Sequence, residues 1–271
     1  MSRNLPSVLI TGASSGIGAV YADRFAHRGH DLVLVARDQA RMEALAARLR
    51  ATAGVQIDVL AADLTNPAEL GTVEKRLREN DRIGILVNNA GAAAPGGVTN
   101  PDLDAFDRLI RLNVTAVTRL AATAATRFAA RGEGAVVNIS SILALIPELT
   151  LGIYGATKSY VLTLSQSLQS ELGPRGVYVQ AVLPAATRTE FWERSGRSID
   201  DLNVVMGVDE LVDAALVGFD RRESVTIPSL SDVERWNAFN GARQAMLPNL
   251  AQPHAAQRYR IQPSSTERVG A

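Results

Sequence analysis

The sequence TGASSGIG, residues 11–18, follows the apolar run Ser7–Thr11 and precedes apolar residues at helical spacing. Glycines at positions 12, 16 and 18 let backbone N–H groups approach a pyrophosphate without Cβ collisions, and the N-terminus of the following helix adds partial positive charge. Taken alone, a glycine triplet also fits an ordinary turn. Its place between a strand and a helix favours a dinucleotide-phosphate site, formed by Gly12, Ser14, Ser15, Gly16, Ile17 and Gly18.

Further strand-length apolar runs follow along the chain: Asp31–Ala36, Val55–Ala61, Ile83–Asn88, Ala135–Ser140, Val177–Leu183 and Ser224–Pro228. Segments with helical spacing separate them, such as the one containing Met42, Leu45 and Leu49. Strict alternation of strand and helix implies right-handed crossovers and a parallel sheet covered on both faces. We therefore predict a doubly wound α/β fold, a three-layer α/β/α sandwich with about seven strands.

Length alone fits one large domain or two small ones. One domain is expected over residues 1–271, because no repeat or low-complexity linker interrupts the alternation of strands and helices. After Leu183 the alternation gives way to a polar stretch beyond a strand's carboxyl end, where a substrate lid is expected at about 185–206. A C-terminal helix near Asp232–Met246 and a tail occupy about 231–271.

Three capping signals set expected helix starts. Asn66-Pro67 and Asn100-Pro101 each combine a capping residue with proline at the first helical position. Asp38 is expected to cap a helix that begins near Gln39.

Composition excludes several classes of function. The chain has 28 basic and 28 acidic residues, so it lacks the charge that attracts nucleic acid or anionic membranes, and we expect neither as a partner. It has no cysteine, and only His27, His30 and His254, so no metal site is expected. The N-terminus shows no signal peptide and no stretch approaches the roughly 18 apolar residues of a membrane span, which favours the cytoplasm.

Further motifs lie downstream of the glycine turn: Asp63 after the third strand, Asn88-Asn89-Ala90-Gly91 after the fourth, Asn113 in a long helix, and Tyr154-Gly155-Ala156-Thr157-Lys158. Ser141 stands thirteen positions before Tyr154. From about Val8 to Thr189 the sequence resembles the short-chain dehydrogenase/reductase family in its TGxxxGxG and YxxxK motifs. The resemblance implies a Rossmann fold and hydride transfer involving a nicotinamide cofactor.

The resemblance implies a catalytic group of Asn113, Ser141, Tyr154 and Lys158. Tyr154 would protonate the substrate oxygen, Ser141 would hydrogen-bond it, and Asn113 would hold a water. Lys158 would lower the pKa of Tyr154 and hold the nicotinamide ribose, and their spacing does place both on one helical face. Alternatively, Tyr154 and Lys158 form a solvated surface pair, and Asn113 is a tolerated polar residue in a helix.

By the same resemblance the remaining cofactor contacts are Asp63, Leu64, Asn89, Ala90, Gly91, Tyr154, Lys158, Pro184, Thr187 and Thr189. Asp63 is alternatively a helix cap, and Asn88 and Asn89 fit structural ties for the fourth strand equally well. The family usually has glycine after Pro184, where this chain has Ala185. Of the two threonines that could meet the nicotinamide carboxamide, we favour Thr189.

The end of the second strand indicates NADPH or NADP as the cofactor. An acidic residue there would bind a ribose 2′-hydroxyl and repel a 2′-phosphate, whereas an arginine does the opposite. Ala36 occupies the acidic position and Arg37 follows it, and Ser14 is a possible second phosphate contact. This resembles the NADP-preferring pattern of the family.

We therefore expect an NADPH-dependent carbonyl reductase or alcohol dehydrogenase that acts, without a metal, on a small or medium, mainly apolar ketone or aldehyde. A dinucleotide-binding regulator would be expected to have a damaged Tyr/Lys pair, and an epimerase a different glycine spacing. By resemblance, helices around Asp104–Arg131 and Tyr154–Leu172 would form a homodimer or homotetramer. The alanine-rich face at Ala121–Ala130 fits such a contact or an ordinary core.

Overall fold

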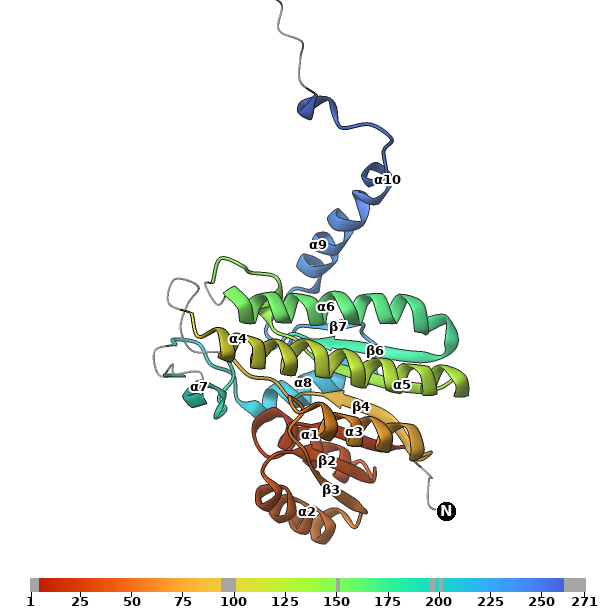
Figure 1. The fold of residues 1–271 in the computed structure, drawn as a ribbon, viewed down its shortest axis with the longest axis vertical. Helices are drawn as coiled ribbons and strands as arrows, with labels where there is room; N and C mark the ends of the chain where they lie inside the picture. The colour runs from red at the N-terminus through yellow and green to blue at the C-terminus, as the bar shows by residue number, and fades with distance from the viewer. Residues whose placement is uncertain (1–4, 94–100, 150–151, 195–197, 200–201, 261–271) are drawn as a thin grey trace, which may run out of the picture. The chain divides into compact units, whose positions relative to one another are not determined.

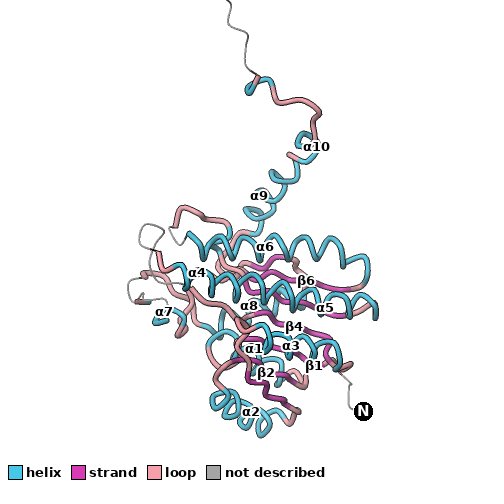
Figure 2. The backbone as a smooth tube through the Cα atoms, viewed as in Figure 1, coloured by secondary structure: helices cyan, strands magenta, loops and turns pink. Residues whose placement is uncertain are grey.

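A parallel sheet organises the chain, with the strand order β3-β2-β1-β4-β5-β6-β7. The computed structural model describes residues 5–93, 101–149, 152–194, 198–199 and 202–260. In this part of the chain the strands are β1 (Ser7–Thr11), β2 (Leu32–Ala36), β3 (Ile57–Ala61), β4 (Ile83–Asn88), β5 (Gly134–Ile139), β6 (Val177–Val182) and β7 (Val225–Thr226). Figure 2 shows them alternating with helices, as predicted.

Helices cover both faces of the sheet (Figure 1). One face packs against α1 (Gly16–His27), α2 (Gln39–Ala53) and α8 (Val208–Asp220), and the other against α3 (Pro67–Glu79), α5 (Val117–Arg131) and α6 (Gly152–Leu172). In β1, Val8 and Ile10 join the first core, while Leu9 between them joins the second. This burial on both sides explains the continuous apolar runs and confirms the three-layer α/β/α prediction.

Two of the predicted helix caps are confirmed. The Asp38 carboxylate accepts a hydrogen bond from the Arg41 N–H at 3.0 Å, where α2 begins. The Asn66 side chain accepts one from the Ala68 N–H at 2.9 Å, with Pro67 at the first position of α3. These caps satisfy N–H groups that have no partner within their own helix.

The helix start predicted at Asn100-Pro101 is wrong. The helix α4 (Leu103–Ile110) begins after Asp102, whose side chain accepts a hydrogen bond from the Ala105 N–H at 2.9 Å. Asn100 itself lies outside the described residues. Asn100 and Asp102 are both residue types that cap helices. Asp102, which is nearer to the first helical residue, Leu103, caps α4.

The alanine-rich face of α5 serves the core of its own chain. Ala121, Ala124 and Ala125 are buried on the sheet face shared with α3. The ordinary-core alternative therefore accounts for the buried alanines, while Ala122 and Ala130 remain exposed on the outer side.

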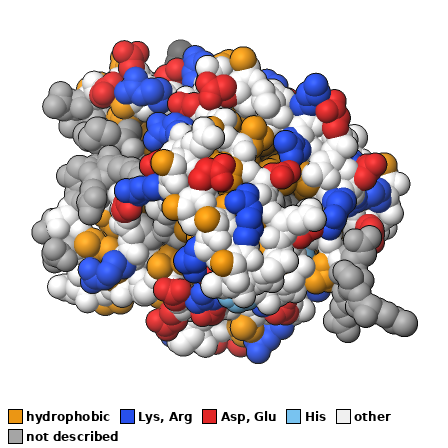
Figure 3. Space-filling model, turned by 90° about the horizontal axis from the view of Figure 1, so that it is seen from below, with side chains coloured by type: hydrophobic (Ala, Val, Ile, Leu, Met, Phe, Trp, Pro, Cys, Tyr) orange, Lys and Arg blue, Asp and Glu red, His pale blue; other side chains and the backbone are white. Residues whose placement is uncertain are grey.

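The chain divides into two compact units, Met1–Ser229 and Leu230–Ala271. The second unit contains α9 (Val233–Ala245), where a helix was expected, followed by α10 (Leu247–Leu250). No helix in the described ranges is long and apolar enough to cross a membrane. On the face in Figure 3, acidic and basic side chains are interspersed. The expectation of a single domain stays a prediction.

Candidate active site

The side chain and backbone of Asn89 join the ends of β1 and β4, where the order of the strands reverses direction. Its Nδ2 donates to the carbonyl oxygens of Thr11 at 2.9 Å and Gly12 at 3.2 Å. The Thr11 hydroxyl accepts from the N–H groups of Asn89 and Ala90, both at 3.0 Å. Ligands of doubly wound sheets bind in the crevice at such a reversal. Asn89 therefore acts as a structural tie at the base of that crevice.

The glycine turn packs directly onto this tie. A Cβ on Gly12 would lie 2.7 Å from Asn89 Nδ2, and φ at Gly12 is +67°, a conformation that favours glycine. A Cβ on Gly18 would lie 2.4 Å from the Gly12 oxygen. Gly12 and Gly18 are therefore required by close packing within the protein, a reason that the sequence pattern did not reveal.

The N-terminus of α1 opens toward the crevice. Ser15 stands at the N-cap position but makes no capping hydrogen bond with its side chain, and the first turn contains no acidic residue. The first N–H groups of the helix thus have no side-chain acceptor, which fits an anionic pyrophosphate.

A cavity of about 1320 Å³ brings most of the predicted site residues together. Its lining includes Gly12, Ser14, Ser15, Gly16, Ile17, Arg37, Asp63, Leu64, Asn89, Ala90, Gly91, Ser141, Tyr154, Lys158, Pro184, Thr187 and Thr189. Two predicted residues, Gly18 and Asn113, lie behind this lining. No group of three or more His, Asp or Glu side chains able to hold a metal occurs among the described residues.

Lys158 and Tyr154 lie together on α6. Lys158 is 5% exposed, its ammonium donates to the Ile139 carbonyl at 2.9 Å, and its Nζ lies 5.6 Å from the centre of the Tyr154 ring. Burial lowers the pKa of Lys158 to about 8. The solvated surface pair considered above is therefore wrong.

The expected lowering of the Tyr154 pKa by Lys158 is not observed. Burial raises the pKa of Tyr154 above its ordinary value, and a hydrogen bond with Ser141 opposes this rise. The phenol is thus held protonated, which is the form that can donate a proton.

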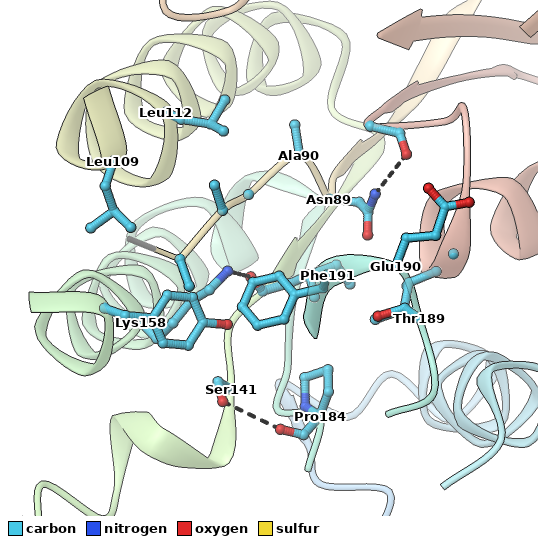
Figure 4. A pocket seen from close by; sticks show the side chains of 18 of the residues that line it. Asn89, Ala90, Leu109, Leu112, Ser141, Lys158, Pro184, Thr189, Glu190 and Phe191 are labelled. Carbon is cyan, nitrogen blue, oxygen red and sulfur yellow. Dashed lines mark hydrogen bonds between the residues drawn. The ribbon is translucent and has the colours of Figure 1, made fainter. Parts of the chain in front are cut away.

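Two adjacent serines have different roles at the end of β5. The Ser141 hydroxyl lies 3.4 Å from the Pro184 oxygen and accepts from the Leu143 N–H at 3.2 Å (Figure 4). The Ser140 hydroxyl donates to the Lys158 carbonyl at 2.7 Å and is buried. Ser140 therefore fixes α6, while Ser141 lines the cavity next to Tyr154.

Asn113 lies in the π-helical turn η1 (Arg111–Ala116) and is 1% exposed. Its Oδ1 accepts from the Ala92 N–H at 3.0 Å, and its Nδ2 donates to the Ala92 carbonyl at 2.9 Å and to Thr157 Oγ1 at 3.1 Å. It connects the segment after β4 to α6, so it is more than a tolerated polar residue. π-Helical turns of this kind are frequent at functional sites.

The structure excludes the helix-cap alternative for Asp63. Its carboxylate accepts from the N–H of Thr65 at 2.9 Å and from its hydroxyl at 2.8 Å, whereas Asn66 caps the helix that follows. Asp63 instead shapes the turn after β3 and lines the cavity beside Leu64.

Arg37 directly follows β2 and lines the cavity there. It is exposed and, within the described ranges, makes no ion pair. A guanidinium without a protein partner at this position is suited to a phosphate.

The two threonines after β6 differ in their surroundings. Thr187 is 5% exposed, and its hydroxyl donates to the Ala185 carbonyl at 2.9 Å. Thr189 faces the glycine turn, where its Cγ2 would lie 3.2 Å from a Cβ on Gly16. The Thr187 hydroxyl is thus already bonded within the protein, and the assignment of Thr189 to the carboxamide stays a prediction. Ala185 has no positive φ, so glycine is not needed there.

Apolar side chains form the other end of the cavity, and the sequence motifs did not identify them. They are Leu109, Leu112, Leu143, Leu149, Phe191 and Trp192. The ring of Phe191, in α7 (Phe191–Arg194), lies 5.5 Å from the Tyr154 ring and 5.7 Å from Trp192. The Trp192 indole donates to the Thr187 carbonyl at 2.8 Å. Trp192 therefore both lines the cavity and holds the segment that follows β6.

Comparison with known proteins shows the family of the chain. A family model described as short chain dehydrogenase matches residues 6–199. A short-chain dehydrogenase from Sphingobium yanoikuyae in complex with NADPH is 62% identical, with a TM-score of 0.92 over 94% of this chain and 100% of that one. A bulky-bulky ketone specific alcohol dehydrogenase from Comamonas testosteroni is 57% identical, with a TM-score of 0.88 over 94% and 99%.

A curated relative is more distant. Very-long-chain 3-oxoacyl-CoA reductase-A from Danio rerio is 35% identical over 67% of this chain and 58% of its own length. The chain thus spans less than two thirds of that relative. From the family match, the chain belongs to the short-chain dehydrogenase/reductase family of oxidoreductases.

The depressed pKa of Lys158 predicts a specific pH dependence of stability. Between pH 8 and the ordinary lysine value of 10.5, the folded protein holds fewer protons than the unfolded chain, so its unfolding free energy rises with pH. Lys158→Met removes this gain. The difference in unfolding free energy, unsubstituted protein minus variant, should grow by about 1–3 kcal/mol from roughly pH 7.5 to roughly pH 10.

Urea denaturation across this pH range measures the difference. Lys75→Met is the matched control, because Lys75 on α3 is 66% exposed. Parallel pH profiles for the unsubstituted protein and Lys158→Met would contradict the buried, destabilised ammonium.

Proposed function

We propose that this protein is an NADPH-dependent oxidoreductase that reduces ketones with bulky apolar substituents or oxidises the matching secondary alcohols. The observation that carries the proposal is a single cavity. The glycine turn and Arg37 line one part of it, and Tyr154, Ser141 and the apolar side chains line another. A dinucleotide site thus continues into an apolar site that contains a proton donor.

The residues of the cleft fit the cofactor. In the proposal, the first turn of α1 holds the pyrophosphate, Arg37 the 2′-phosphate, Asp63 the adenine, Lys158 the nicotinamide ribose and Thr189 the carboxamide. The NADPH bound to the Sphingobium yanoikuyae relative supports this assignment. When bound, NADPH supplies the hydride.

Side chains of the protein stabilise the charge that develops on the substrate oxygen and supply its proton. As negative charge develops on the substrate oxygen, Tyr154 donates its phenolic proton and Ser141 donates a hydrogen bond to the same oxygen. Lys158, anchored by the Ile139 carbonyl and 5.6 Å from the centre of the Tyr154 ring, provides a positive charge beside the phenolate that remains, while burial keeps the phenol protonated until the proton is transferred. Asn113 orders a water near Lys158 through which the proton is replaced.

The lining of the cavity favours a bulky ketone over the small or medium substrate expected from the sequence. The volume of about 1320 Å³ includes both the part assigned to the dinucleotide and the apolar part. Leu109, Leu112, Leu149 and Phe191 present apolar surface there. The Comamonas testosteroni relative, described as specific for bulky-bulky ketones, supports this substrate class.

We also propose a homodimer or homotetramer that uses the outer faces of α5 and α6. The small side chains Ala122 and Ala130 are exposed on α5. Tyr160 on α6 is 38% exposed, with its hydroxyl 2.8 Å from that of Thr118. Light scattering after size-exclusion chromatography tests this assembly.

Tyr154→Phe tests the proposed activity. The purified protein, given NADPH and a panel of ketones, should consume NADPH, measured by the nicotinamide absorbance. Tyr154→Phe should lower kcat by about 10²- to 10⁴-fold, since the proton donor is lost. NADPH affinity should stay close to that of the unsubstituted protein. A fully active variant would require another acid.

Arg37→Met tests the choice of cofactor. Loss of a charge-assisted contact to the 2′-phosphate should weaken NADPH binding by about 10- to 100-fold. NADH lacks this phosphate, so its affinity should be unchanged and serves as the internal control. Equal weakening of both cofactors, measured by fluorescence titration, would remove Arg37 as the discriminating residue.

Phe191→Ala tests the substrate class. Removing the ring that packs against Tyr154 should raise kcat/KM for ketones with two large substituents by about tenfold relative to methyl ketones. Val217→Ala is the matched control, because Val217 on α8 is 47% exposed and is not among the residues that line the cavity. An unchanged ratio would show that Phe191 does not limit substrate size.

A further inference from the structure

An ion pair connects two distant parts of the chain beside the cofactor cleft. Nη1 of Arg41, on α2, lies 2.8 Å from each carboxylate oxygen of Glu190, which is 149 residues further along the chain. Arg41 Nε is 3.4 Å from the Asp38 carboxylate, which also caps the helix. Arg41 is thus held between a residue of its own helix and one of the segment after β6.

The pair lies across the crevice. Arg41 follows β2 and Glu190 follows β6, and in the sheet these strands are separated by β1, β4 and β5. Asp38 and Glu190 both line the cavity. Figure 4 shows Glu190 beside Thr189, at the end of the cavity away from Leu109 and Leu112. The ion pair therefore joins two opposite walls on the cofactor side.

Arg41 and Glu190 lie close in sequence to residues that the proposed function assigns to dinucleotide binding. Arg37 lies one turn before Arg41 in sequence, and Thr189 directly precedes Glu190. Thr189 in turn lies against Gly16 of the glycine turn. A dinucleotide that reaches from Arg37 to Thr189 would pass within the walls that this pair connects.

We propose that Arg41 and Glu190 form a clasp that holds the cleft closed over bound NADPH and slows its release. The clasp rests on the proposed NADPH binding. Neither residue is placed at the reacting atoms, so both act as positioning residues: Glu190 holds Thr189 toward the glycine turn, and Arg41 anchors Glu190 to α2. Opening the cleft requires the ion pair to break.

The expected effect is modest because the pair is half-exposed. The side chains are 49% and 39% exposed, and ion pairs in such surroundings are partly screened by water. Both short contacts to the carboxylate come from the one atom Nη1, so the pair lacks the two parallel N–H bonds of a bidentate arrangement. Loss of the clasp should raise the rate of NADPH dissociation by about 2- to 5-fold.

Stopped-flow fluorescence measures this rate when bound NADPH is displaced by excess NADP⁺. Arg41→Met and Glu190→Gln should each raise it 2- to 5-fold, and the double variant should exceed neither single variant appreciably, since the Arg41–Glu190 pair is already lost in each of them. Arg48→Met is the matched control. It lies on the same helix, is 56% exposed and pairs with Asp23 of α1 at 3.0 Å, so its ion pair does not reach the segment after β6.

Salt gives a readout that a merely structural role would not produce. Because high ionic strength weakens the pair in the unsubstituted protein, the ratio of the variant rates to its rate should fall toward one in about 0.5 M NaCl. Unchanged dissociation in the single variants, or effects that multiply in the double variant, would overturn the clasp. Failure of the unsubstituted protein to bind NADPH would overturn the proposed function and the clasp together, whereas normal binding with unchanged release overturns the clasp alone.

Discussion

The site depends on the hydrogen bonds that Asn89 and Thr11 make between the ends of β1 and β4. These strands are neighbours in the sheet, yet the chain leaves them in opposite directions around it. The tie fixes the separation of the glycine turn from the segment after β4. Gly12 and Gly18 must lack side chains because this separation is so small. Phosphate binding and close packing thus impose the same glycines.

A second set of buried hydrogen bonds fixes α6, and with it Tyr154 and Lys158. Ser140 holds the Lys158 carbonyl, and Asn113 reaches Thr157 from the segment after β4. Farther along the helix, the Asn138 amide of β5 donates to the Ser165 hydroxyl at 2.9 Å. Buried polar groups are costly unless paired, so these bonds favour one position of the helix. Tyr154 and Lys158, the proposed catalytic residues, are thereby held in a fixed position relative to the strands and the cleft.

The fold was predictable because strands buried on both faces leave continuous apolar runs, as in Ile83–Asn88. The site motifs were predictable because their residues occur close together in the sequence or at strand ends. Contacts between distant segments were not, since they depend on packing: Arg41 reaching Glu190 is one, and Leu109 lining the cavity is another. The surroundings of each side chain could not be predicted either, because residue spacing does not show that burial lowers the pKa of Lys158.

In the proposed function, Tyr154 and Ser141 act together on one substrate oxygen within a cleft that holds NADPH. A crystal structure of the protein with NADP⁺ and an unreactive bulky ketone analogue tests this most directly. Both hydroxyl oxygens should lie at hydrogen-bonding distance, roughly 2.6–3.2 Å, from the carbonyl oxygen, with the nucleotide along the glycine turn. A carbonyl oxygen bound elsewhere in a closed complex, or a nucleotide outside the crevice, would contradict it.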